Sequence, residues 1–128
     1  MPHTIRIIGP WNARFTSRGT EQTQAFRVPG EFSLHDEQAG IQLVRMFNRP
    51  TGLDANSLVD IQVNGEFGST ISIELNGHSV AKSCDENCQF PIQHLLQSSN
   101  QLVIAIDSPT QKSVRLDLVQ LVIDGSNH

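Results

Sequence analysis

Two cysteines are the first residues whose types and spacing suggest chemistry. Cys84 and Cys88 enclose the acidic, polar segment Asp85, Glu86 and Asn87. Two interpretations stay open: a disulfide that pins a ligand loop, or two reduced thiols. A redox role is not expected, because neighbouring carboxylates raise the pKa of a thiol and disfavour the reactive thiolate. The segment between the cysteines is therefore a candidate ligand loop.

Hydrolysis of a glycoside would need two carboxyl groups that face each other across the substrate, either about 5 Å or about 6.5–9.5 Å apart. The adjacent pairs Asp36-Glu37 and Asp85-Glu86 do not suit this role, because neighbours on a strand point to opposite faces. The five histidines are accompanied by no Gly-x-Ser-x-Gly nucleophile motif. The sequence thus predicts no catalytic residue, no cofactor and no enzyme.

A metal site is not expected either. The two cysteines lack the second cysteine or histidine pair of a zinc site. Calcium needs several oxygen ligands from one loop, whereas the acidic loop residues Asp36, Glu37 and Asp54 are scattered.

Ligand binding is the remaining chemistry. Trp11 follows Gly9-Pro10, so we place it near a strand end, where its ring either caps the core or offers a platform to a sugar. His78 follows Asn76-Gly77, the clearest two-residue hairpin signal in the chain, and is predicted to be a turn residue. The candidate ligand-binding residues are Trp11, Asn12, Arg14, His78, Asp85, Glu86 and Asn87.

Strands must position these side chains, because the dominant hydrophobic period is two. Residues 59–63, 71–75 and 114–118 alternate apolar with polar, which is typical of antiparallel sheet with one face on the core. The apolar run 102–106 predicts a central strand covered on both faces. Turn residues separate the runs. The predicted strands span 4–8, 12–16, 24–28, 41–47, 57–64, 70–75, 101–107 and 113–123.

These strands predict an all-β fold, a two-sheet antiparallel jelly-roll sandwich of about eight strands, in one domain over residues 1–128. Ile92, Leu95 and Leu96 share one face of a helical turn and should plug an end of the sandwich, with His94 outward. The core should contain Ile61, Val63, Ile71, Ile73, Leu75, Leu102, Ile104, Leu116 and Leu118.

The last strand carries a break in its pattern. Val114, Leu116 and Leu118 occupy even positions, whereas Leu121 and Ile123 occupy odd ones. A one-residue slip reverses the faces of a strand, and a β-bulge accommodates it. We predict the bulge at residue 119 or 120.

Four motifs in a fixed order suggest a family. Residues 45–50, Arg-Met-Phe-Asn-Arg-Pro, precede the Leu-Asn-Gly of residues 75–77, the Phe-Pro-Ile-Gln-His-Leu-Leu of residues 90–96 and the Asn-Gln-Leu-Val-Ile of residues 100–104. This order resembles the N-terminal sugar-binding jelly-roll domain of β-galactosidase and β-glucuronidase-type glycosidases, a galactose-binding-like β-sandwich. This chain departs from the family pattern at two positions: it has Pro91 where the family usually has an aspartate, and Glu74 where the family often has an aromatic residue. The resemblance implies a carbohydrate-binding module without the catalytic domain. The alternative is a protein-interaction or structural module with no sugar ligand.

Charge and composition exclude other partners. The 128 residues hold 9 Lys and Arg against 13 Asp and Glu, and no basic cluster predicts a nucleic-acid or membrane partner. The first eight residues lack a signal-peptide pattern, so a cytoplasmic protein is predicted, or a secreted or periplasmic one if a leader was removed. The sequence sets no oligomeric state and leaves a carbohydrate or a protein as the expected partner.

Overall fold

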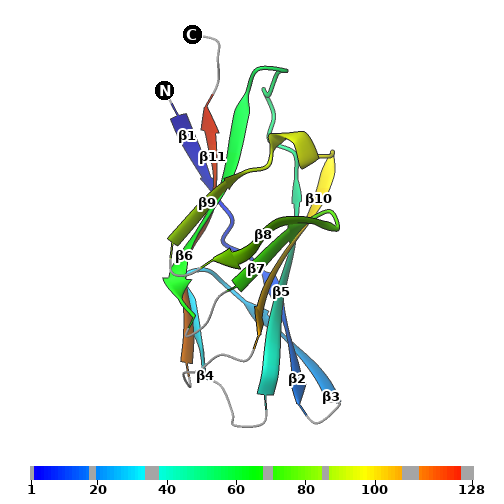
Figure 1. Ribbon diagram of the computed structural model, residues 1–128, viewed down its shortest axis with the longest axis vertical. Coiled ribbons are helices and arrows are strands. Elements are labelled where there is room, and N and C mark those ends of the chain that lie inside the picture. The colour runs from blue at the N-terminus through cyan, green and yellow to red at the C-terminus, as the bar shows by residue number, and fades with distance from the viewer. Residues whose placement is uncertain are drawn as a thin grey trace.

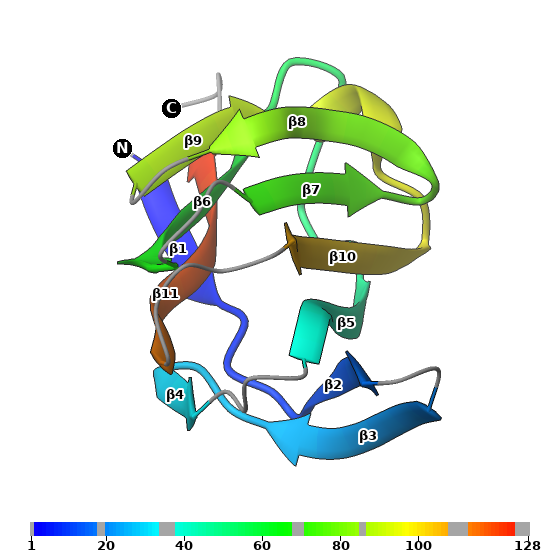
Figure 2. The ribbon, with the colours of Figure 1, turned by 60° about the horizontal axis from the view of Figure 1, so that its bottom comes forward.

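The computed structural model describes residues 2–17, 20–33, 38–67, 71–84, 87–107 and 113–124. Within these residues, antiparallel strands form two sheets that pack face to face (Figures 1 and 2). The five-stranded sheet has the order β1 (Pro2–Arg6), β11 (Ser113–Asp124), β6 (Leu58–Glu66) and β9 (Asn87–Pro91), with β4 (Gly30–Ser33) also paired to β11. The six-stranded sheet has the order β3 (Thr20–Phe26), β2 (Trp11–Ser17), β5 (Gln38–Asn48), β10 (Ser99–Asp107), β7 (Ile71–Leu75) and β8 (His78–Cys84).

The predicted all-β sandwich is therefore confirmed. Each of the eight predicted ranges overlaps an observed strand, while β4, β8 and β9 lie outside those ranges. These three strands are short or lack a clean apolar alternation: in β9 the inward residues Cys88 and Phe90 are only half-buried. They form because neighbouring strands pair with them, which a hydrophobic pattern alone does not reveal.

The core lies between the two inner faces. Eight of the nine predicted core residues are buried, and Leu118 is the exception. The inner faces of β6 and β7 contribute every second residue, as the alternation predicted. The largest fully buried side chains are Trp11, Phe67, Ile41, Leu43, Ile61, Ile71, Ile73, Leu75, Ile92, Leu102, Ile104 and Ile106.

Strand β10 is central, as predicted, with β5 on one side and β7 on the other. The prediction that both of its faces are covered was wrong for the outer face. Val103 and Ala105 point outward there and are only half-buried. The apolar run was misleading because small and β-branched residues suit an open sheet face as well as a core.

Strand β11 contains the predicted irregularity, but at a different residue. Leu116 pairs with Gly65 and Leu118 pairs with Asn64, so the extra residue is Asp117 rather than residue 119 or 120. As a result Val119 is buried at 1% exposure, whereas Leu118 turns to the outer face and is only half-buried. Gly65 explains the position, since a Cβ there would lie 2.3 Å from the carbonyl oxygen of Arg115.

The hairpin between β7 and β8 is confirmed. Asn76 and Gly77 have φ angles of 54° and 82°, the two positive values that a type I′ turn requires. His78 is not a turn residue as predicted: it opens β8 and pairs with Leu75. The turn ends at Gly77, so the next residue is free to join the ladder.

The predicted plug is also present. A 3-10 helix, η1 (Gln93–Leu95), follows β9 (Figure 1). Ile92 is 1% exposed, and Leu95 and Leu96 are half-buried against the core, while His94 is exposed.

No helix in the described ranges is long and apolar enough to cross a membrane.

Buried Asn100 ties this end of the sandwich together. Its Oδ1 accepts from the backbone N–H of Gln97 at 2.8 Å and from Asn76 Nδ2 at 3.0 Å. Its Nδ2 donates to the carbonyl of Gln97 at 2.9 Å. Asn76 in turn donates from Nδ2 to the carbonyl of Leu95 and accepts at Oδ1 from the N–H of Gln101. The Leu-Asn-Gly and Asn-Gln-Leu motifs are thus joined in space.

Candidate ligand-binding site

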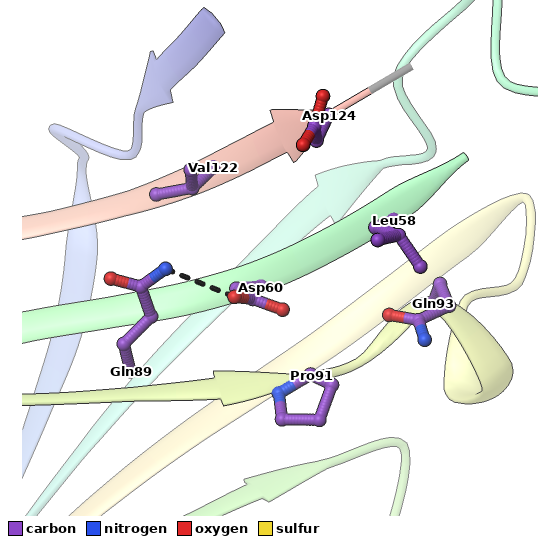
Figure 3. A pocket seen from close by; sticks show the side chains of 7 residues that line it. All are labelled: Leu58, Asp60, Gln89, Pro91, Gln93, Val122 and Asp124. Atoms are coloured by element: carbon purple, nitrogen blue, oxygen red, sulfur yellow. Dashed lines mark hydrogen bonds between the residues drawn. The ribbon is translucent and has the colours of Figure 1, made fainter. Parts of the chain in front are cut away.

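A pocket of about 270 Å³ lies on the outer face of the five-stranded sheet. It sits where β6 begins, β9 and β11 end, and η1 starts (Figure 3). Because three strands and the helical turn converge here, residues far apart in sequence share one surface. Its lining residues are Leu58, Asp60, Gln89, Pro91, Gln93, Val122 and Asp124.

Hydrogen bonds fix the polar side chains of the pocket. Gln89 Nε2 donates to Asp60 Oδ2 across the β6–β9 ladder at 2.9 Å (Figure 3). Gln93 Oε1 accepts from the backbone N–H of Val59 at 3.3 Å. The Gln89 oxygen and the Gln93 nitrogen are chemically able to accept and donate toward a ligand. The lining of the pocket therefore contains groups of both hydrogen-bonding types.

Apolar side chains alternate with the polar ones around the pocket. Leu58 is 55% exposed, Pro91 is exposed and Val122 is half-buried. Val122 pairs with Asp60, which pairs with Pro91, so one cross-strand row combines an aliphatic side chain, a carboxylate and a pyrrolidine ring. A site of this composition suits a ligand with both apolar and hydroxyl-bearing surfaces.

A row of amides extends the polar surface beside the pocket. Gln120 Nε2 donates to Gln62 Oε1 at 2.7 Å, and Gln62 pairs with Gln89 across the next ladder. At the other end of this row Gln120 pairs with Arg6 of the edge strand β1. Planar side chains from four neighbouring strands thus lie side by side along one line across the sheet.

The electrostatics of this face differ from one end to the other. Asp124 and Asp60 occupy diagonal positions on the adjacent strands β11 and β6. Residues at diagonal positions of an antiparallel pair are in general roughly 7–8 Å apart. At the far end, Arg115 Nε lies 2.7 Å from Asp117 Oδ1 and its Nη2 lies 3.4 Å from Glu66. The hydrogen bond and charge of Asp117, with the charge of Glu66, raise the pKa of Arg115 above its ordinary value.

Metal binding has no support in the described part of the chain, where no three His, Cys, Asp or Glu side chains form a group suited to an ion. Asp54, one of the scattered acids, is engaged in its own turn. Its Oδ1 accepts from the backbone N–H of Asn56 at 2.8 Å and from Ser57 Oγ at 3.2 Å. This is the local capping role typical of aspartate in loops.

The residues that the sequence suggested as ligand contacts are spread over two sheets. Trp11 is fully buried, and its Nε1 donates to the carbonyl of Ile7 at 3.1 Å, so the ring caps the core and presents no platform. Asn12 and Arg14 are exposed on the outer face of the six-stranded sheet, and His78 is exposed at the start of β8. These positions do not converge on one site.

The cysteine segment lies partly outside the described residues, which exclude Asp85 and Glu86. Cys88 is disulfide-bonded, and Cys84 is the chain's only other cysteine. Asn87 is exposed on β9, two residues before Gln89 and therefore on the same face as the pocket. It is the one predicted ligand contact that the described structure brings next to this pocket.

Sequence reasoning missed all seven lining residues. The alternating pattern predicts that Asp60 and Gln62 lie on the solvent-facing side of a strand, and the structure agrees. The pattern does not indicate that this side of the strand carries a pocket. The usable signal was an excess of amides and carboxylates at outward positions of β6, β9 and β11. That signal becomes a site only when the order β11-β6-β9 is known.

No protein-family model and no curated relative matches the sequence. Solved structures match by fold. The FMN-binding β-glucuronidase from Facaelibacterium prausnitzii L2-6 is 15% identical with a TM-score of 0.77, over 96% of this chain and 22% of that one. The Bifidobacterium dentium β-glucuronidase complexed with coumarin-3-O-glucuronide is 13% identical with a TM-score of 0.71, over 95% and 30%.

A β-D-mannosidase from Dictyoglomus thermophilum is also similar, at 14% identity and a TM-score of 0.62, over 84% of this chain and 16% of that one. The chain thus spans less than a third of the length of each of these glycosidases. The resemblance that the motifs predicted is confirmed at the level of fold. At such identities the likeness carries no residue role, and the named glycosidases differ in the sugar they act on.

Proposed function

We propose that this chain is a non-catalytic carbohydrate-binding module and that its sugar occupies the pocket between β6, β9 and β11. The observation that carries the proposal is the mixed lining of that pocket. A saccharide presents hydroxyl groups that both donate and accept, and C–H faces that are apolar. Gln89, Gln93 and the two aspartates match the hydroxyls, and Leu58 with its apolar neighbours matches the C–H face.

Pre-organisation supports the same conclusion. The Gln89–Asp60 and Gln120–Gln62 hydrogen bonds hold long side chains in place before a ligand arrives. A ligand then costs less side-chain entropy on binding. The amide row continues from the pocket across β6 and β11, so the surface suits an oligosaccharide lying across the strands rather than one isolated ring.

The absence of catalysis is part of the proposal. Asp60 and Asp124 lie at diagonal positions on one sheet face, and Asp124 is exposed. A glycosidase places its two carboxyl groups on opposite sides of the scissile bond and keeps the general acid in an apolar setting. The span of less than a third of each similar glycosidase agrees with an accessory module. Aryl glycosides should accordingly remain uncleaved.

A protein-interaction role is the competing function, and the exposed apolar residues favour it less. Among the described residues, the exposed large hydrophobic side chains are Ile5, Ile8, Met46 and Leu58. Ile5 and Ile8 lie in and just after β1, Met46 lies on the six-stranded sheet and Leu58 lies in the pocket, so the four do not form one patch. Scattered single hydrophobic residues are normal on a soluble surface.

Isothermal titration against a panel of soluble oligosaccharides tests the proposal, with Gln89→Ala as the pocket variant. Gln89 is exposed, so its loss should leave folding intact and weaken binding about fivefold or more through lost hydrogen bonds. Gln42→Ala, an exposed glutamine on β5 of the other sheet, is the matched control and should bind like the parent protein. Equal binding by both variants, or no binding to any saccharide, would contradict the proposal.

A further inference from the structure

The ionisable side chains that line the pocket are all acidic. Asp60 and Asp124 contribute the charge, and the other five lining residues are neutral. The two carboxylates come from adjacent strands at diagonal positions and line the same pocket.

The described cations on this face do not neutralise the pocket. Arg115 is paired with Asp117 and Glu66 at the opposite end of β11 and β6. Arg6 lies in the row of Gln120, on the edge strand, and is not a lining residue. A ligand that enters the pocket therefore meets two negative charges and no positive one among its lining residues.

We propose, on the basis of the carbohydrate-binding function above, that the pocket prefers sugars bearing a protonated amine, takes neutral sugars less tightly and rejects uronic acids. An ammonium group that reaches Asp60 or Asp124 would form charge-assisted hydrogen bonds, which are stronger than neutral ones. A sugar carboxylate in the same place would be repelled. The named β-glucuronidases share the fold, yet the lining charge of this pocket disfavours a glucuronide-like ligand.

The test compares β-1,4-linked oligomers of glucosamine, glucose and glucuronic acid of equal length, by titration calorimetry at a pH where the amine is protonated. We expect the glucosamine oligomer to bind about fivefold more tightly than the glucose oligomer, as two partly exposed ion pairs allow. The preference should shrink between about 0.01 M and about 1 M salt, because screening weakens exposed charge pairs. The glucuronic acid oligomer should bind more weakly than both.

Charge-removing variants locate the effect. Asp60→Asn and Asp124→Asn should each lower the ratio of the affinity for the glucosamine oligomer to the affinity for the glucose oligomer, because each removes one of the two negative charges of the pocket. Glu74→Gln removes one charge from the exposed outer face of the six-stranded sheet and is the matched control, which should keep the full preference. Equal affinities for the three oligomers, or a preference for the glucuronic acid oligomer, would overturn this inference and leave sugar binding intact. A failure of all three to bind would overturn the proposed function and this inference with it.

Discussion

Asn76 Nδ2 donates to Asn100 Oδ1 over 3.0 Å and thereby joins the β7–β8 turn to the start of β10. The two asparagines belong to two of the motifs on which the family resemblance depended, Leu-Asn-Gly and Asn-Gln-Leu. Their side chains satisfy backbone groups of Leu95, Gln97 and Gln101 at one end of the sandwich. These motifs therefore report the architecture of the fold rather than a binding site.

Replacing Asn100 with alanine should lower the free energy of unfolding by about 2 kcal/mol, because buried backbone groups lose their partners. Urea denaturation measures the change. Gln101→Ala is the control, since Gln101 is exposed and contacts Asn76 through its backbone only. A loss below about 0.5 kcal/mol for Asn100→Ala, which is the range of ordinary surface substitutions, would show that the network does not stabilise the fold.

The bulge at Asp117 predicts opposite responses at two neighbouring positions. Val119→Asn places an amide in the core and should cost about 3 kcal/mol or more, since burial of the valine is lost and the amide lacks partners. Leu118→Asn changes a half-buried outer position and should cost about 1 kcal/mol or less. Thermal and urea unfolding of the two variants measure these losses of stability. A larger loss for Leu118→Asn than for Val119→Asn would contradict a bulge at Asp117 and favour one at residue 119 or 120.

Gly65 makes this bulge sterically feasible. In Gly65→Ala the new Cβ would lie 2.3 Å from the Arg115 carbonyl oxygen, a backbone atom that cannot move aside cheaply. We expect a loss of about 1–3 kcal/mol, as for other overpacked sites. Ser79→Ala, at an exposed position of β8, should stay within about 0.5 kcal/mol of the parent protein. An unchanged unfolding midpoint for Gly65→Ala would show that β6 and β11 can move apart at this position with little loss of stability, and that the bulge does not require a glycine there.

Local patterns predicted the faces of β6 and β7 because, over residues 59–63 and 71–75, each inward position is apolar and each outward one is polar. The slip in β11 was visible for the same reason. Its position was not, since it depends on Gly65 across the ladder rather than on β11 itself. The role of Trp11 stayed open because a strand-end tryptophan can face either way, and here the Ile7 carbonyl receives its indole N–H inside the core.

The pocket was beyond sequence reasoning for a topological reason. Its residues come from positions near 60, 90 and 123, which become neighbours only because β11 and β9 flank β6. No local period encodes that strand order. The Gln89–Asp60 hydrogen bond, which orients the polar side of the pocket, joins side chains 29 positions apart.

Sugar binding at this pocket is tested most directly by mapping amide chemical-shift changes in ¹⁵N-labelled protein during titration with a glucosamine or glucose oligomer. We expect the largest changes at the backbone amides of Asp60, Gln89 and Val122 and at the side-chain amides of Gln89 and Gln93. The outer face of the six-stranded sheet, reported by Asn12 and Ser72, should stay unchanged. Shifts concentrated at Asn12 and Ser72, or no shifts at saturating sugar, would contradict a sugar site between β6, β9 and β11.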